Sequence, residues 1–344
     1  MTDAPHNAVI VTGPSSPLAA ASRPVPALIA DAGPQASHRF IEFFTATIRN
    51  PHTREAYARA AVQFFTWCES HRLDLHSLQP SIVATYIEQL MRERSAPTVK
   101  QHLAAIRMLF DYLVVGQVLP SNPAASVRGP KYVIKTGKTP VLTAEQARTL
   151  LDSIEIERLD EATGEPVPIL IGLRDRAIIA VMAYSFARIS AVTAMNVEDY
   201  WQNGKRWWLR LHEKGGKHHE VPAHHNVEAY LDAYLRAARI NEAYKTPLFR
   251  TIPGHASAAG SVTDRRFARR DALAMVKRRA KAAGLPRGTC NHTFRATGIT
   301  TYLKGGGTLE KAQAIAAHSS ATTTKLYDRT RDELTLDEIE RIVI

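Results

Sequence analysis

Residues 37–127 carry one kind of apolar periodicity, and it restricts the fold more than any other feature of this chain. Apolar side chains recur there at intervals of three and four residues, which is the period of an α-helix. Tyr57, Ala61, Phe64 and Cys68 lie on one such stripe. The segment is long enough for four helices. The sequence therefore predicts a small all-α domain over residues 37–127.

Polar caps and helix breakers predict where this domain begins and ends. Thr53 and Ser81 each precede an apolar stripe and are expected to cap helices. Asn122-Pro123 is expected to end the last helix. Residues 1–36 are rich in Ala, Pro and Ser without apolar periodicity, so they are expected to form a disordered tail.

A polar stretch without periodicity follows at residues 128–141. It contains Lys131, Lys135 and Lys138. Because it is basic and carries no apolar stripe, it is predicted to be a linker that can lie along a phosphate backbone.

The second domain, residues 142–344, is predicted to open at Thr143, whose spacing to Gln146 is typical of a capping box. Its pattern is mostly helical, but 207–211 and 220–222 flank a Gly-Gly turn and predict a β-hairpin. The expected fold class is therefore mainly α (α+β): a helical domain, then a mostly α domain with a small antiparallel sheet.

The charge balance favours a polyanionic partner. The chain has 44 Lys+Arg against 33 Asp+Glu, a formal net charge of +11, and basic side chains gain affinity for nucleic acid by releasing counterions. The most basic segment is expected to be helical, with pairs spaced to share a face. Its cations are Arg265, Arg266, Arg269, Arg270, Lys277, Arg278, Arg279, Lys281 and Arg287. A solvated helix face is the alternative.

Several classes of protein lack support. Cys68 and Cys290 are the only cysteines and belong to no CxxC pair, so neither a disulfide framework nor a zinc site is expected, and a reducing cytoplasm fits. No secretion signal or membrane span is predicted. The histidines at 218, 219, 224 and 225 have no spacing typical of metal ligands.

The order of six residues along the chain is more informative than any one of them. They are Arg188, Lys214, His292, Arg295, His318 and Tyr327. Taken singly, each is more often a core, capping or surface residue than a catalyst. Together, and with their flanking sequences, they resemble the active-site series of the tyrosine recombinase (phage integrase) family over residues 38–343. The boxes are Arg188-Ile189-Ser190, His212-Glu213-Lys214-Gly215-Gly216-Lys217, His292-Thr293-Phe294-Arg295, and Ala317-His318-Ser319-Ser320 with Thr323-Thr324 and Tyr327.

Three positions depart from the family pattern. The family commonly has an acidic residue after its arginine box, where this chain has Ala191. It often has a Thr-Gly pair before that box, where this chain has Ser185-Phe186, and a Gly before the later histidine, where this chain has Ala317. None of these changes removes a reacting group. The first raises the question of what holds Arg188 in place.

The resemblance implies a chemistry that the residue types can perform. Guanidiniums neutralise charge on the non-bridging oxygens of a phosphodiester, so Arg188 and Arg295 are expected to bind them, with His318 as a third donor. A tyrosine phenol has an ordinary pKa near 10, so Tyr327 as nucleophile needs a base, for which His292 is the candidate. Lys214, or Lys217 in its place, is expected to protonate the leaving 5′-oxygen. No metal or nucleotide cofactor is implied.

The resemblance also implies partners. Residues 37–127 are expected to act as a core-binding domain that grips double-stranded DNA together with the catalytic domain, and the active assembly is expected to be a homo-tetramer on paired sites. A helix near 335–343 is expected to dock on a neighbouring protomer or on its own domain. Two other functions stay open at this point: a type IB topoisomerase-like enzyme and a non-catalytic DNA-binding accessory protein.

Overall fold

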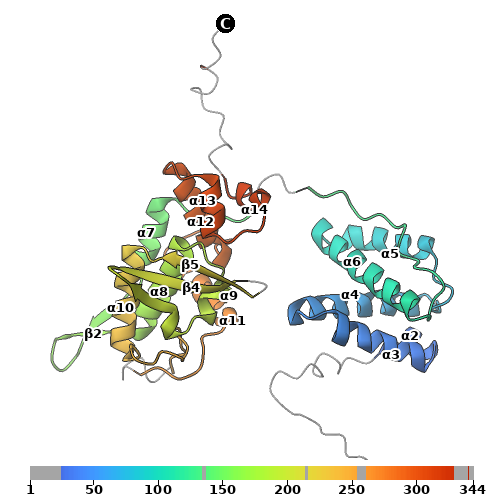
Figure 1. Ribbon diagram of the computed structural model, residues 1–344, viewed down its shortest axis with the longest axis horizontal. Helices are drawn as coiled ribbons and strands as arrows, with labels where there is room; N and C mark the ends of the chain where they lie inside the picture. The colour runs from blue at the N-terminus through green and yellow to red at the C-terminus, as the bar shows by residue number, and fades with distance from the viewer. Residues whose placement is uncertain (1–24, 134–136, 214–215, 254–260, 329–339, 341–344) are drawn as a thin grey trace, which may run out of the picture. The chain divides into compact units, whose positions relative to one another are not determined.

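The chain divides into two compact units, Met1–Val133 and Ile134–Ile344 (Figure 1). Each unit has its own hydrophobic core. The computed structural model describes residues 25–133, 137–213, 216–253, 261–328 and 340. Within those ranges, no helix combines the length and the apolar character needed to cross a bilayer.

The first unit is all helical among its described residues. Its elements are α2 (Ala27–Asp31), α3 (Pro34–Glu42), a π-helical turn (Phe43–Thr47), α4 (Pro51–Ser70), α5 (Pro80–Glu93) and α6 (Ala96–Val115). Aromatic rings fill its centre, where Phe64 meets Tyr86 and Phe110 edge-on. Such edge-to-face packing suits the quadrupoles of the rings.

Local details at the start of this unit differ from the prediction. The tail predicted for residues 1–36 is wrong over its last part, because Leu28 and Ile29 of α2 are buried in the core. A single turn buries too few residues to show periodicity. The caps were also misplaced: Asn50 caps α4 by accepting from two backbone amides, and α5 begins at Pro80, ahead of Ser81. In both helices proline takes the first position, which it favours.

The second unit is mostly helical with two small antiparallel sheets. Its helices are α7 (Ala144–Asp152), α8 (Leu170–Tyr184), α9 (Ile189–Ala194), α10 (His225–Ala238), α11 (Arg269–Ala282), α12 (Asn291–Lys304), α13 (Leu309–Ile315) and α14 (Ala321–Lys325). Its strands are β1 (Glu157–Leu159), β2 (Pro166–Pro168), β3 (Tyr200–Asn203), β4 (Arg206–Glu213) and β5 (Lys217–Pro222). The expected capping box of Thr143 and Gln146 opens α7. The predicted fold class is confirmed.

Helix α8 lies at the centre of this unit, between α10 and α12. Its side chains are buried on nearly every face, which explains why it shows little amphipathic pattern. Gly298 lets α12 approach it closely, because a Cβ there would lie 2.0 Å from the carbonyl oxygen of Ala183. The close packing fixes the end of α8, and the chain that follows it, against α12.

The sheet β3-β4-β5 contains the predicted hairpin together with a strand, β3, that the sequence pattern did not reveal. The pair β1–β2 was likewise not predicted, because its residues are exposed. Helix α11 begins at Arg269, so Arg265 and Arg266 precede it. The expectation that they share a helix face with Arg269 and Arg270 is therefore wrong.

Candidate active site

Arg295 is the buried central residue of a cluster of predicted site residues in the second unit. It lies on α12, and only 1% of its surface is exposed. Its guanidinium donates to two backbone carbonyls, that of Phe186 after α8 and that of Ala316 after α13. Burial, first, and the charge of Arg188, second, lower its pKa to about 10. It therefore stays cationic at neutral pH and joins three segments of the chain.

The first carbonyl belongs to a residue with left-handed backbone, Phe186, and the second belongs to the residue just before one, Ala317. Phe186 has φ +55° and Ala317 has φ +47°, a region where a Cβ is disfavoured. These are the two positions where the related family often has glycine. Ala317 ends α13 in a Schellman motif, since its N–H donates to Ala314 and that of His318 to Gln313. The motif aligns His318 immediately after the turn.

Arg188 precedes α9 and is held from the side of the sheet. Its Nη1 lies 2.5 Å from Oε2 of Glu213, the last residue of β4. Oε1 of the same carboxylate lies 4.0 Å from Nη1 of Arg295. Glu213 is buried and Arg188 is partly exposed. One carboxylate therefore bridges two guanidiniums, and one of them remains accessible.

His318 and Tyr327 complete the cluster from the chain around α14. Their rings stack with centroids 5.8 Å apart and an interplanar angle of 8°. Nδ1 of His318 lies 2.9 Å from the hydroxyl of Thr324, and Thr300 of α12 donates a hydrogen bond to the carbonyl of Tyr327. Burial and the charges of Arg295 and Arg188 lower the pKa of His318 to about 4, so its ring is neutral at physiological pH.

His292 lies one turn before Arg295 on α12, at the exposed rim of the cluster. Its pKa is lowered by partial desolvation of the ring and by the positive charges of Arg295, Arg188 and Arg269. A neutral imidazole can accept a proton, as a general base must. The structure thus links Arg188 to Arg295 through one carboxylate and His318 to Tyr327 through ring stacking. The charges of both arginines act on His292 and His318.

The remaining predicted site residues are placed in different ways. Lys214 and Lys135 lie outside the described residues. Lys131, Lys138, Arg265, Arg269, Arg270 and Lys277 are exposed. Arg266 has a structural role instead of a free one, because its guanidinium donates to the carbonyls of Thr193 and Met195. The residue is exposed, but its guanidinium is held by these bonds and by one to the Asn196 side chain.

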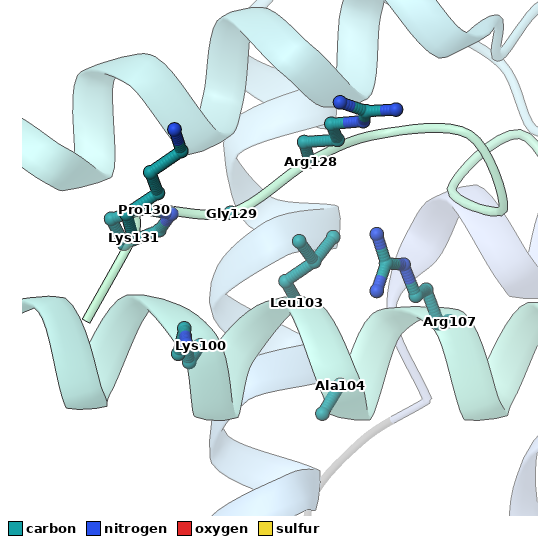
Figure 2. Close-up of a pocket in the computed structure, with 8 residues that line it drawn as sticks. All are labelled: Lys100, Leu103, Ala104, Arg107, Arg128, Gly129, Pro130 and Lys131. Carbon is teal, nitrogen blue, oxygen red and sulfur yellow. The ribbon is translucent and has the colours of Figure 1, made fainter. Parts of the chain in front are cut away.

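A basic pocket of about 490 Å³ occurs in the first unit, where the segment Arg128–Lys131 crosses α6 (Figure 2). No acidic residue lines it. Its lining residues are Lys100, Leu103, Ala104, Arg107, Arg128, Gly129, Pro130 and Lys131. Arg107 is committed to the carbonyls of Ala124 and Val127, which fixes the segment on the helix. Arg128 and Lys131 are exposed and able to meet an anion.

The histidine-rich segment pairs rings and forms no metal cluster among the described residues. His224 stacks on Tyr184, and His212 meets His218 edge-on. His219 bonds the carbonyl of Ile315, which joins β5 to the end of α13. These contacts give the histidines structural roles beside the cluster.

Two family models match this chain. The model described as the phage integrase family matches residues 140–333, which is more than half of the chain and includes every residue of the cluster. The chain belongs to the phage integrase family. A second model, the N-terminal SAM-like domain of phage integrases, matches residues 39–116 of the first unit. The predicted identification as a tyrosine recombinase is confirmed.

Several recombinases resemble this chain in sequence or fold over most of its length. The tyrosine recombinase XerC of Thermodesulfovibrio yellowstonii is 28% identical over 80% of this chain and 85% of its own length. XerC of Myxococcus xanthus is 27% identical over 85% and 90%. A XerH site-specific recombinase bound to its difH substrate has a TM-score of 0.60 at 20% identity, covering 84% of this chain and 78% of that one. A lambda integrase dimer bound to a COC′ core site has a TM-score of 0.61 at 16% identity, covering 87% and 79%.

Two residues of the site had no role assigned from the sequence. Glu213 appeared only as a neighbour of Lys214. The alternation Leu209, Leu211, Glu213 along β4 places it on the buried face of the strand, and that was an available signal. Thr324 carried no such signal, because its contact with His318 depends on the turn into α14.

Proposed function

We propose that this site-specific recombinase breaks a DNA strand by attack of Tyr327 on a phosphodiester, and that the resulting 3′-phosphotyrosyl bond is later resealed by a 5′-hydroxyl. The observation that carries the proposal is the convergence on Arg295. Its guanidinium bonds the carbonyls of Phe186 and Ala316, and Glu213 lies between it and Arg188. No metal or nucleotide enters this scheme.

Charge neutralisation is the role proposed for Arg188, Arg295 and His318. Attack on phosphorus concentrates negative charge on the non-bridging oxygens, and fixed donors in a partly desolvated site stabilise it. Nδ1 of His318 lies 2.9 Å from the Thr324 hydroxyl. We assign the proton of the neutral ring to Nε2, the tautomer in which Nδ1 accepts from that hydroxyl. That nitrogen is then free to donate to a phosphate oxygen.

Two protons must move for the bonds to balance. As the Tyr327 oxygen bonds to phosphorus, its phenol proton passes to His292, whose lowered pKa leaves the ring unprotonated before the step. As the bond from phosphorus to the 5′-oxygen breaks, Lys214 supplies the proton that makes the 5′-hydroxyl. Because the new phosphoester retains the energy of the old one, a 5′-hydroxyl of another strand can reverse the step.

Double-stranded DNA is the proposed partner of both units. In the first unit the exposed cations Arg128 and Lys131 of the basic pocket are suited to a backbone phosphate (Figure 2). In the second unit the charge of Arg269 acts on His292, and we propose that Arg269 and the exposed Arg270 and Lys277 of the same helix contact phosphates. We also propose a homo-tetramer on paired sites as the active assembly, and docking of the segment near 335–343 on a neighbouring protomer or on its own domain; both rest on the family. Apart from residue 340, that segment lies outside the described residues. The two free cysteines support a proposed cytoplasmic location.

The test uses a nicked suicide duplex that traps covalent intermediates, and it requires a target site, found from inverted repeats near the gene or by selection from random DNA. Wild-type enzyme is expected to form a protein–DNA adduct on gels that survives denaturation. Tyr327→Phe should form none, because it lacks the nucleophilic oxygen, while it keeps duplex affinity within about twofold. Tyr302→Phe, which removes a hydroxyl from the same apolar cluster, is the matched control and should react normally.

Two results would contradict the proposal. An adduct that persists in Tyr327→Phe would assign the nucleophile to another residue. Relaxation of supercoiled plasmids without any particular site, and without strand exchange between paired sites, would favour a topoisomerase-like enzyme instead.

A further inference from the structure

Glu213 faces the cluster because side chains alternate between the two faces of a β-strand. Side chains of β4 point alternately to the two faces of the sheet, so Leu209, Leu211 and Glu213 share the inner face. The two leucines are buried in the core of the unit. Glu213 ends the series at the edge of that core, facing the predicted site residues.

Burial of this carboxylate requires compensation, and two arginines supply it. An unpaired buried carboxylate is strongly unfavourable, and the Glu213 side chain is only 3% exposed. Its Oε2 lies 2.5 Å from Nη1 of Arg188, and its Oε1 lies 4.0 Å from Nη1 of Arg295. The carboxylate therefore lies between two cations that would otherwise repel each other.

Arg188 has no other partner among the described residues that could fix its direction. Its neighbour Ala191, at the position where the family commonly has an acidic residue, is fully buried in α9 and has no polar group. Arg295, by contrast, is held by two carbonyls whether or not Glu213 is present. The bridge consequently matters most for Arg188, whose Nε and Nη2 stay free of partners in the described parts of the chain.

We propose that Glu213 is a positioning residue that orients Arg188 beside Arg295 before the phosphate binds, in place of the acidic residue missing at Ala191. The inference rests on the proposed function. A correctly aimed Arg188 affects the chemical step more than DNA affinity.

The experiment compares full-length Glu213→Gln, Glu213→Asp and wild type in single-turnover cleavage of the nicked duplex. Glutamine keeps the shape but loses the charge, so the rate at saturating DNA should fall at least about tenfold, or about 1.4 kcal/mol of barrier. The DNA concentration for half-saturation should change less than about twofold, and the aspartate variant should recover part of the rate. Glu220→Gln is the matched control, because it breaks the exposed pair with Arg210 in the same hairpin.

The amplitude of the reaction separates positioning from folding. A purely structural role for Glu213 would lower the melting temperature and the fraction of active enzyme, with the rate per active molecule unchanged. That result, or a wild-type rate in Glu213→Gln, would overturn the inference. A wild-type enzyme that forms no adduct at all would instead overturn the proposed function.

Discussion

Replacing Ala317 by glycine should stabilise the catalytic unit, although substitutions to glycine in helical regions usually destabilise. Ala317 is the left-handed residue of the Schellman motif that ends α13, with φ +47°. An L-residue with a Cβ pays about 1–2 kcal/mol for this conformation. Glycine would remove that strain but gain freedom in the unfolded chain, which costs about 0.4–1 kcal/mol. The expected net gain is about 0.5–1 kcal/mol, the difference between these two terms.

Calorimetry of the full-length chain can measure this gain, which should raise the melting temperature of the second unit by about 1–4 °C. The matched control is Ala314→Gly, the same substitution three positions earlier at an exposed site within α13. There glycine should cost up to about 1 kcal/mol, because the backbone is already right-handed. If Ala317→Gly lowered the melting temperature as much as Ala314→Gly, the strain argument would be refuted.

Two further predictions concern pH and salt. The pKa of His318 is lowered to about 4 by burial and by Arg295 and Arg188, so its contribution to stability is complete above pH 6.5 and is lost as the pH falls towards 4. Between pH 7 and pH 5, urea unfolding should show wild type losing about 2 kcal/mol more than His318→Gln; parallel curves would contradict this. Arg270, which is 94% exposed, should contribute only to phosphate binding, so Arg270→Ala should lower the slope of log affinity against log salt by about 1 on any duplex sequence. An unchanged slope would exclude a phosphate contact.

The sequence was sufficient for features that depend on local pattern. The stripe through Tyr57 and Phe64 predicted α4, and the Thr143–Gln146 spacing predicted the start of α7. The hairpin of β4 and β5 followed from a Gly-Gly turn between apolar runs. The order of the site residues was sufficient to identify the family, because it does not depend on how the chain folds.

Features that depend on distant contacts were not predictable. The strands β1 and β3 carry no clear alternation, and α2 is one turn whose leucine and isoleucine are buried only because α3 and α4 cover them. The bridge from Glu213 to Arg188 joins residues 25 apart in the sequence. A missing acid at Ala191 could be seen in the sequence, but its replacement by a strand residue required the fold.

The two carbonyls that hold Arg295 come from segments 109 and 21 residues away along the chain. The arginine therefore acquires its orientation only after the end of α8, the middle of α12 and the end of α13 have docked. A nascent chain, or one with α13 detached, contains the tyrosine but lacks an assembled anion site. The proposed phosphate site therefore forms only with the finished tertiary structure, and the proposed strand cleavage requires a fully folded second unit.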